Sequence, residues 1–228
     1  MVAMSQNLRL SLSKVLTIIV LGGLFFVSYG WQNHLTSQMA DVPHFYFWWE
    51  KSIPFVPWLV IPYMSSDVVF VIGFLLCRDM RELKTLGSRA LFLNLLSIAI
   101  FALMPLRVAF VRPQVTNAVL APIFQLLSMD QPFNQFPSMH ISYGLIFWQI
   151  IRTRATARLK WAVDTWFLMI AASTVMIFQH HVIDLIGGFM VGALAICLYP
   201  NAQMLGQGIE SRLEGQGSST RLEALYAS

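Results

Sequence analysis

The stretch "QHHVIDLIGGFMVGALAICLY" (residues 179–199) joins two kinds of sequence that seldom lie side by side. From Val182 onward it is an almost continuous apolar run, long enough to form a helix that crosses a bilayer. Its first residues, however, place His180, His181 and Asp184 within five positions. Burying one charged group at the centre of a membrane helix costs roughly 2.5 kcal/mol or more, so three polar groups together require an explanation.

The rest of the chain has the composition of a membrane protein. Of its 228 residues, 57% are hydrophobic and 11% are charged, and the mean hydropathy is +0.63. Soluble domains carry about 25% charged residues. Apolar runs predict six transmembrane helices in a single all-α bundle, at residues 15–31, 55–77, 89–106, 138–153, 161–179 and 182–199. The stretch 118–127 is too short to cross and is expected to be re-entrant or interfacial.

The same pattern predicts one membrane domain over residues 1–200 and a polar cytoplasmic tail over residues 201–228. The first apolar run follows Arg9 and Lys14 and has no small-residue cleavage site behind it, which indicates a retained signal anchor. The tail contains "GQGSSTRLE" (residues 215–223), whose polar, mixed-charge composition is typical of a solvated segment.

Basic residues predict the orientation of the bundle. With six spans, the loops on one side carry only Lys51, Arg107 and Arg112. The other side carries the remaining twelve of the fifteen: Arg9, Lys14, Arg78, Arg81, Lys84, Arg89, Arg152, Arg154, Arg158, Lys160, Arg212 and Arg221. The positive-inside rule makes this second side, with both termini, cytoplasmic. The net charge of +4 thus reflects topology, and we expect no nucleic-acid partner.

His180 and Asp184 are four residues apart, so they share one face of a helix. The carboxylate can accept the proton of one ring nitrogen and leave the other nitrogen free as a nucleophile or base. His181 points about 100° away, lacks such a partner and is expected at headgroup level or behind the site. The alternative for the His180–Asp184 pair is an interfacial histidine satisfied by a nearby acid.

Two further motifs are predicted to open onto the same non-cytoplasmic face. In "FPSMH" (residues 136–140), Ser138 reads as the N-cap of the fourth span, whose start is a ready phosphate site, with His140 facing the anion as an acid. In "PLRVAFVRP" (residues 105–113), Arg112 offers a guanidinium suited to phosphate oxygens, and Arg107 lies deeper. The alternatives are an ordinary capped helix and arginines that snorkel toward headgroups.

Together these motifs resemble the signature of the type-2 phosphatidic acid phosphatase superfamily. The family pattern is KxxxxxxRP, PSGH and SRxxxxxHxxxD on a six-helix membrane core, and the match runs from about residue 105 to 190. The resemblance implies a phosphohistidine on His180, orientation of that ring by Asp184, and protonation of the leaving group by His140. It also implies phosphate binding by Arg112 and Ser138.

The chain departs from the family pattern at three positions. Pro105 stands in place of the family lysine, for which Arg107 is a possible substitute, Met139 in place of the PSGH glycine, and Thr174 in place of the arginine that follows Ser173. "FPSMH" with "HHVIDLIGG" is more similar to the inositolphosphorylceramide synthase and sphingomyelin synthase branch, whose members transfer a phosphoryl headgroup between lipids.

We therefore expect an integral membrane enzyme, a lipid phosphatase or phosphotransferase, acting at the non-cytoplasmic face of a bacterial inner membrane. The histidines already have distinct roles and do not form the three-ligand set of a zinc site, so we expect neither metal nor other cofactor. The expected partners are the bilayer and a phospholipid or lipid-phosphate substrate, while the oligomeric state is left open. A transporter and a catalytically inactive lipid-binding relative are the alternatives from other classes.

Overall fold

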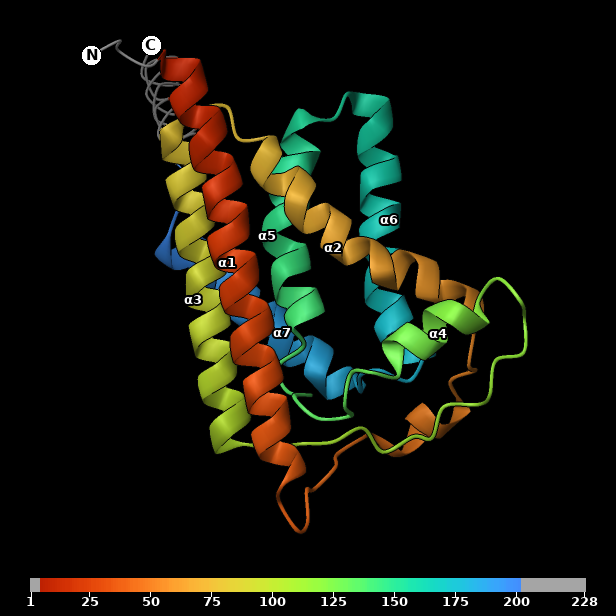
Figure 1. The fold of residues 1–228 in the computed structure, drawn as a ribbon. Coiled ribbons are helices and arrows are strands. Elements are labelled where there is room, and N and C mark those ends of the chain that lie inside the picture. Colours follow the sequence, from red (N-terminus) through yellow and green to blue (C-terminus); the bar gives the residue numbers. More distant parts are fainter. Residues whose placement is uncertain (1–4, 202–228) are drawn as a thin grey trace, which may run out of the picture.

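A computed structural model describes residues 5–201 of the chain (Figure 1). Within this range all regular structure is helical and no strand occurs. The elements in chain order are α1 (Gln6–Ser37), the 3-10 turns η1 (Trp48–Ser52) and η2 (Pro57–Leu59), α2 (Val60–Leu75), α3 (Met80–Leu103), α4 (Ala121–Leu127), α5 (Met139–Arg154), α6 (Ala157–Met176) and α7 (Val182–Leu198). Apart from Asn201, the predicted tail lies outside the described residues.

Each of the six apolar runs predicted from the sequence coincides with one long helix. These helices are α1, α2, α3, α5, α6 and α7, and the short stretch before the fourth run contains only the seven-residue α4. Three helical segments, Gln6–Ser37, Pro57–Leu75 and Met80–Leu103, are long and apolar enough to cross a membrane, and Val182–Leu198 is a shorter apolar helix. The helices are confirmed, whereas a crossing by all six stays a prediction.

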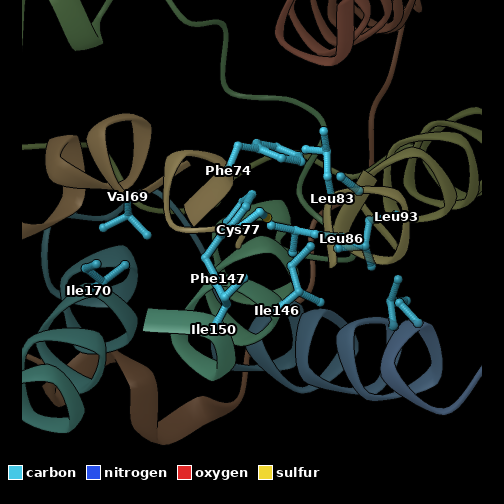
Figure 2. Close-up of a cluster of buried hydrophobic side chains, with 13 residues drawn as sticks. Val69, Phe74, Cys77, Leu83, Leu86, Leu93, Ile146, Phe147, Ile150 and Ile170 are labelled. Atoms are coloured by element: carbon cyan, nitrogen blue, oxygen red, sulfur yellow. The ribbon is translucent and has the colours of Figure 1, made fainter. Parts of the chain in front are cut away.

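Helix α5 is the centre of the bundle and contacts α2, α3, α6 and α7. Its side chains Ile146, Phe147 and Ile150 lie in a buried apolar cluster with Phe74 of α2 and Leu93 of α3 (Figure 2). Because lipid tails are as apolar as these side chains, such contacts stabilise a membrane bundle through close packing rather than through exclusion of water.

Helices α5 and α7 approach each other through glycines. A Cβ atom at Gly188 would collide with the carbonyl oxygen of Ser138, and one at Gly192 would lie 3.1 Å from the carbonyl oxygen of Ser142. The backbone N–H of Ser138 also donates to the carbonyl of Asp184 at 2.9 Å. Small residues four apart permit this approach. The first turns of α5 and α7, which carry two of the three motifs, are thereby held against one another.

The loops lie at two opposite ends of the bundle. In Figure 1 the start of α1 and the α5–α6 turn lie at the top, while the segments 38–59 and 104–120 begin at the bottom and rise along the right-hand side to α2 and α4. At the upper end Arg154 of α5 is paired with Glu82 of α3, with Nη2 2.6 Å from Oε1. At the other end the segments 38–59 and 104–120 surround the first turn of α7. The candidate site is therefore built from residues far apart in the sequence.

Candidate active site

Two histidines meet where α5 and α7 begin. Ser138 is the N-cap of α5, as the sequence predicts, and His140 lies in the first turn. The His140 ring stacks on Tyr63 of α2, with centroids 4.2 Å apart, and its edge faces the His180 ring at 6.0 Å. This arrangement brings both rings close enough to contact one phosphoryl group.

His180 lies just before α7 rather than on it, because the helix begins at Val182. Its backbone N–H donates to the carbonyl of Thr174 at 2.9 Å, which holds the short α6–α7 connection in place. The buried ring turns Nδ1 toward Asp184, 3.4 Å from Oδ2. This separation is longer than an ordinary N–H···O hydrogen bond, and within residues 5–201 the Nδ1 atom has no hydrogen-bond partner. The pairing leaves Nε2 as the atom available for chemistry.

The carboxylate of Asp184 is itself fixed by the start of α7. Its Oδ2 accepts the backbone N–H of His181, the N-cap residue, at 2.8 Å. A carboxylate in the first turn of a helix is also stabilised by the positive end of the helix dipole. Asp184 is therefore held directly beside the His180 ring.

The expectation that His181 lacks a partner is wrong. Its ring is 1% exposed, and Nδ1 lies 3.0 Å from Oε2 of Glu50, a fully buried residue of η1. The backbone N–H of Ala109 donates to Nε2 at 2.9 Å. Because Nε2 accepts a hydrogen bond, the proton of the neutral ring is on Nδ1 and is donated to Glu50. Both ring nitrogens of His181 therefore have hydrogen-bond partners, as in a histidine that stabilises the local structure.

Glu50 is the residue whose importance sequence reasoning missed. Besides His181, its carboxylate accepts the backbone N–H groups of Phe47 at 2.9 Å and Val182 at 3.2 Å. It therefore ties the aromatic loop 44–51 to the first turn of α7. In the sequence it stands between Trp49 and Lys51, which reads as part of an interfacial aromatic belt. Its partner is 131 residues away, so no local pattern identifies it.

Arg112 and Ser138 supply the polar groups that the sequence assigns to phosphate binding. Nε of Arg112 donates to the carbonyl of Ile177 at 3.1 Å, and the guanidinium lies over the ring of Phe124 at 5.6 Å. Burial lowers the pKa of Arg112, but an arginine stays charged under these conditions. Within residues 5–201 the Oγ of Ser138 is buried without a hydrogen-bond partner. Ser138 is the N-cap residue of α5, but its hydroxyl makes no capping hydrogen bond to the helix.

Arg107 lies in a different environment. Both arginines follow the end of α3 at Leu103, in the irregular segment 104–120, rather than on the helix. Nε of Arg107 donates to the carbonyl of Val42 at 2.9 Å, and the backbone N–H of Arg107 donates to Pro43. These contacts bind Arg107 to the segment after α1. The structure therefore brings His180, Asp184, His140 and Ser138 together, with Arg112 bonded to the nearby α6–α7 connection and Arg107 held elsewhere.

Asp130 is a further acidic group that the sequence did not single out. Its carboxyl accepts hydrogen bonds from Asn33 Nδ2 at 2.9 Å and from the Tyr29 hydroxyl at 3.3 Å. Desolvation by the surrounding chain raises the pKa of Asp130 to about 6, although the hydrogen bond from Tyr29 and the nearby charge of Arg112 lower it. A carboxyl group with this pKa can exchange protons near neutral pH. Among residues 5–201, no three His, Cys, Asp or Glu side chains converge as metal ligands.

The family model described as the PAP2 superfamily matches residues 38–198 of the chain. The chain belongs to this superfamily. The matched range begins at the end of α1, continues through α7 and includes every candidate site residue. No curated protein and no solved structure matches the chain. Membership supports a phosphoric ester hydrolase or phosphotransferase in general and suggests a phosphatase-type activity on lipid phosphates.

Proposed function

We propose that the protein is an integral membrane lipid phosphatase or phosphotransferase that works through a phosphohistidine on His180. The observation that carries this proposal is the proximity of the His140 and His180 rings, whose centroids are 6.0 Å apart. Asp184 lies beside His180, with its Oδ2 3.4 Å from Nδ1. Superfamily membership supports the reaction class. The phosphoester of a lipid is the substrate.

The residues suit a two-step displacement. The Nε2 lone pair of His180 attacks phosphorus, the bond between phosphorus and the leaving oxygen breaks, and His140 gives that oxygen a proton. Water or an acceptor hydroxyl then attacks the phosphohistidine. The P–N bond breaks, its electron pair returns to Nε2, and the proton of the attacking oxygen passes to His140. Asp184 stabilises the positive charge that develops on the His180 ring.

Charge on the phosphoryl oxygens is balanced by groups that are already in position. Arg112 donates from its guanidinium, and the first turn of α5 directs backbone N–H groups and its dipole toward the same region. Donors fixed before the reaction cost no reorganisation in the transition state, and one such donor is worth roughly 2.7–4 kcal/mol. The mechanism therefore requires no metal ion.

Transfer from a phosphodiester is the second candidate reaction. Thr174, which replaces a family arginine, donates its hydroxyl to Ala171 within its own helix. Arg107, the possible substitute for the family lysine, is engaged with Val42. A phosphodiester carries one charge fewer than a phosphomonoester and needs fewer cations. We therefore propose that a headgroup phosphotransferase of the inositolphosphorylceramide synthase type is the form of activity to test beside hydrolysis.

The proposal includes the orientation of the helices in the membrane. The six helices cross the inner membrane, with twelve of the fifteen basic residues and both termini on the cytoplasmic side. The candidate site then faces the opposite, non-cytoplasmic compartment. The substrate is drawn from the lipid leaflet on that side.

The decisive experiment incubates purified protein in vesicles with phosphatidic acid or with a phosphodiester lipid and an acceptor alcohol. Free phosphate and new lipid species are both followed, with and without EDTA. We expect turnover that survives EDTA, and use of the phosphodiester at a rate at least comparable to that of phosphatidic acid. Rapid phosphate release from phosphatidic acid alone identifies a plain phosphatase. Lipid binding without turnover contradicts the enzymatic proposal.

A further inference from the structure

A groove of about 370 Å³ lies between α5 and α6, two helices that run side by side in Figure 1. Its α5 wall includes Ile141, Gly144, Leu145 and Trp148, and its α6 wall includes Asp164, Phe167, Leu168 and Ala171. Both sets have the spacing i, i+3, i+4, i+7, so each is one continuous helix face. Apart from the two ends, the lining is apolar.

His140 is the residue that connects this groove to the candidate active site. It lines the groove, and its ring also faces the ring of His180 at 6.0 Å. At the other end, Asp164 accepts hydrogen bonds from Trp148 Nε1 at 2.7 Å and Arg152 Nε at 2.8 Å. The groove therefore has one reactive end, apolar walls and a polar far end.

We propose that the groove binds one hydrocarbon chain of the lipid substrate while the phosphate lies at His140 and His180. The identity of the headgroup end rests on the proposed function, whereas binding of the chain does not. The polarity of the groove fixes the orientation of the ligand, because only a molecule with a phosphate at one end and hydrocarbon behind it matches both parts. The site therefore selects a lipid phosphoester rather than a small soluble one.

The dimensions fit a single chain. His140 and Trp148 are eight residues apart on α5, so the groove is about 12 Å long at the helical rise per residue. One leaflet of a bilayer has a hydrocarbon depth of about 15 Å. A chain that lies along α5 can thus remain at the depth it has in the leaflet while its headgroup reaches the histidines.

Gly144 keeps the α5 wall open near the middle of the groove. A Cβ atom there would lie 3.9 Å from Cδ1 of Phe167, an ordinary contact distance. A methyl group therefore fits at this position. A larger side chain projects into the space between the helices. This makes Gly144→Leu a variant that fills the groove without colliding with the backbone.

The first test compares Gly144→Leu with Gly23→Leu on lipid phosphates of long and short chain length. Gly23 lies in α1, and a Cβ atom there meets nothing within 4 Å, so this control makes the same chemical change in another helix. We expect Gly144→Leu to lower kcat/KM at least tenfold for dipalmitoyl phosphatidic acid and less than twofold for the dibutyryl lipid. Gly23→Leu should change neither value by more than twofold.

Equal losses with both chain lengths, or no loss with either, would overturn the proposal. Ala171→Leu fills the groove from the α6 wall and is expected to give the same selectivity, so the test does not depend on the folding of one variant. A shift in the preferred chain length toward shorter lipids in both variants distinguishes a filled groove from general damage to the site.

The second test does not require turnover. Phosphatidic acid with a diazirine near the end of one chain is bound to the wild-type protein, irradiated, and the labelled residues are found by mass spectrometry. We expect label on residues 141–148 and 164–171, displaced by unlabelled phosphatidic acid and reduced in Gly144→Leu. Label spread evenly over α1 and the groove would show ordinary bilayer contact and overturn the proposal. Label in the groove without any catalysis would uphold it and contradict the proposed function instead.

Discussion

At the scale of single residues, neighbouring histidines have opposite environments. His180 has one nitrogen toward Asp184 and the other available, whereas both nitrogens of His181 are engaged, by Glu50 and by Ala109. A nucleophile needs a free lone pair, and a structural histidine needs none. The two side chains are adjacent in sequence, yet only His181 has both ring nitrogens bonded.

We predict that His180→Ala abolishes turnover and that His140→Ala lowers kcat by about 10² or more, as expected for loss of a general acid. His34→Ala is the matched control, because His34 is exposed near the end of α1 and remote in sequence from His140 and His180. Steady-state assays on vesicle-bound protein measure the effect. Full activity in His180→Ala would assign the nucleophile to another residue.

Glu50→Gln should destabilise the protein although it changes a single atom. Oε2 of Glu50 receives two hydrogen bonds, from His181 and from the backbone of Val182, and an amide nitrogen in its place can accept neither. If the amide is flipped, its nitrogen takes the place of Oε1 and cannot accept the hydrogen bond that the backbone N–H of Phe47 donates there. We expect a loss of about 1–3 kcal/mol in unfolding free energy.

Thermal unfolding in detergent measures this loss, with Asp41→Asn as the control for the same chemical change at an exposed carboxylate. We expect a clear fall in Tm for Glu50→Gln and little change for Asp41→Asn. An unchanged Tm in Glu50→Gln would show that the buried pair does not stabilise the first turn of α7.

At the scale of elements, the contact between α5 and α7 brings together the two motifs that contain the candidate histidines. The two helices begin next to each other because Ser138 bonds to Asp184 and because glycines on α7 admit the backbone of α5. The motifs "FPSMH" and "HHVID" are about 40 residues apart in sequence. Only close helix packing brings their functional groups together.

Gly188→Ala should separate these helices. The added Cβ atom would collide with the carbonyl oxygen of Ser138, a backbone atom that cannot move to another rotamer. Overpacking of this kind costs about 1–3 kcal/mol. We expect a lower Tm together with reduced kcat. Gly23→Ala is the control, since its Cβ atom meets nothing within 4 Å, and it should leave both quantities close to wild type. A Gly188→Ala protein with normal Tm and kcat would contradict the prediction.

At the scale of the whole molecule, the candidate site lies at one end of the bundle, and the helix ends at the other carry most of the basic residues within residues 5–201. Val111 is 91% exposed in the segment beside Arg112, and Thr156 is exposed in the α5–α6 turn. In a variant whose Cys77 and Cys197 are replaced by serine, Val111→Cys should react with an impermeant thiol reagent added to intact cells. Thr156→Cys should react only after the membrane is permeabilised. The opposite labelling pattern would move the site to the cytoplasmic face.

Much of the fold follows from local sequence. Six apolar runs predicted the six long helices, because a continuous apolar run satisfies its backbone hydrogen bonds only as a helix in lipid. Ser138 predicted the start of α5. The third run was predicted to extend to residue 106, whereas α3 ends at Leu103.

The candidate site was predictable only in part, for the same physical reason. The place of His140 in the first turn of α5 is local, and the sequence by itself determined it. The proximity of His180 to Asp184 was also expected, but on one helix face, whereas His180 lies before α7. The pairing of Glu50 with His181, the stacking of Tyr63 on His140, the contacts of Asp130 and the groove between α5 and α6 join segments far apart in the chain. Hydrogen bonds and packing across such separations depend on how helices are arranged, and only the tertiary structure decided them.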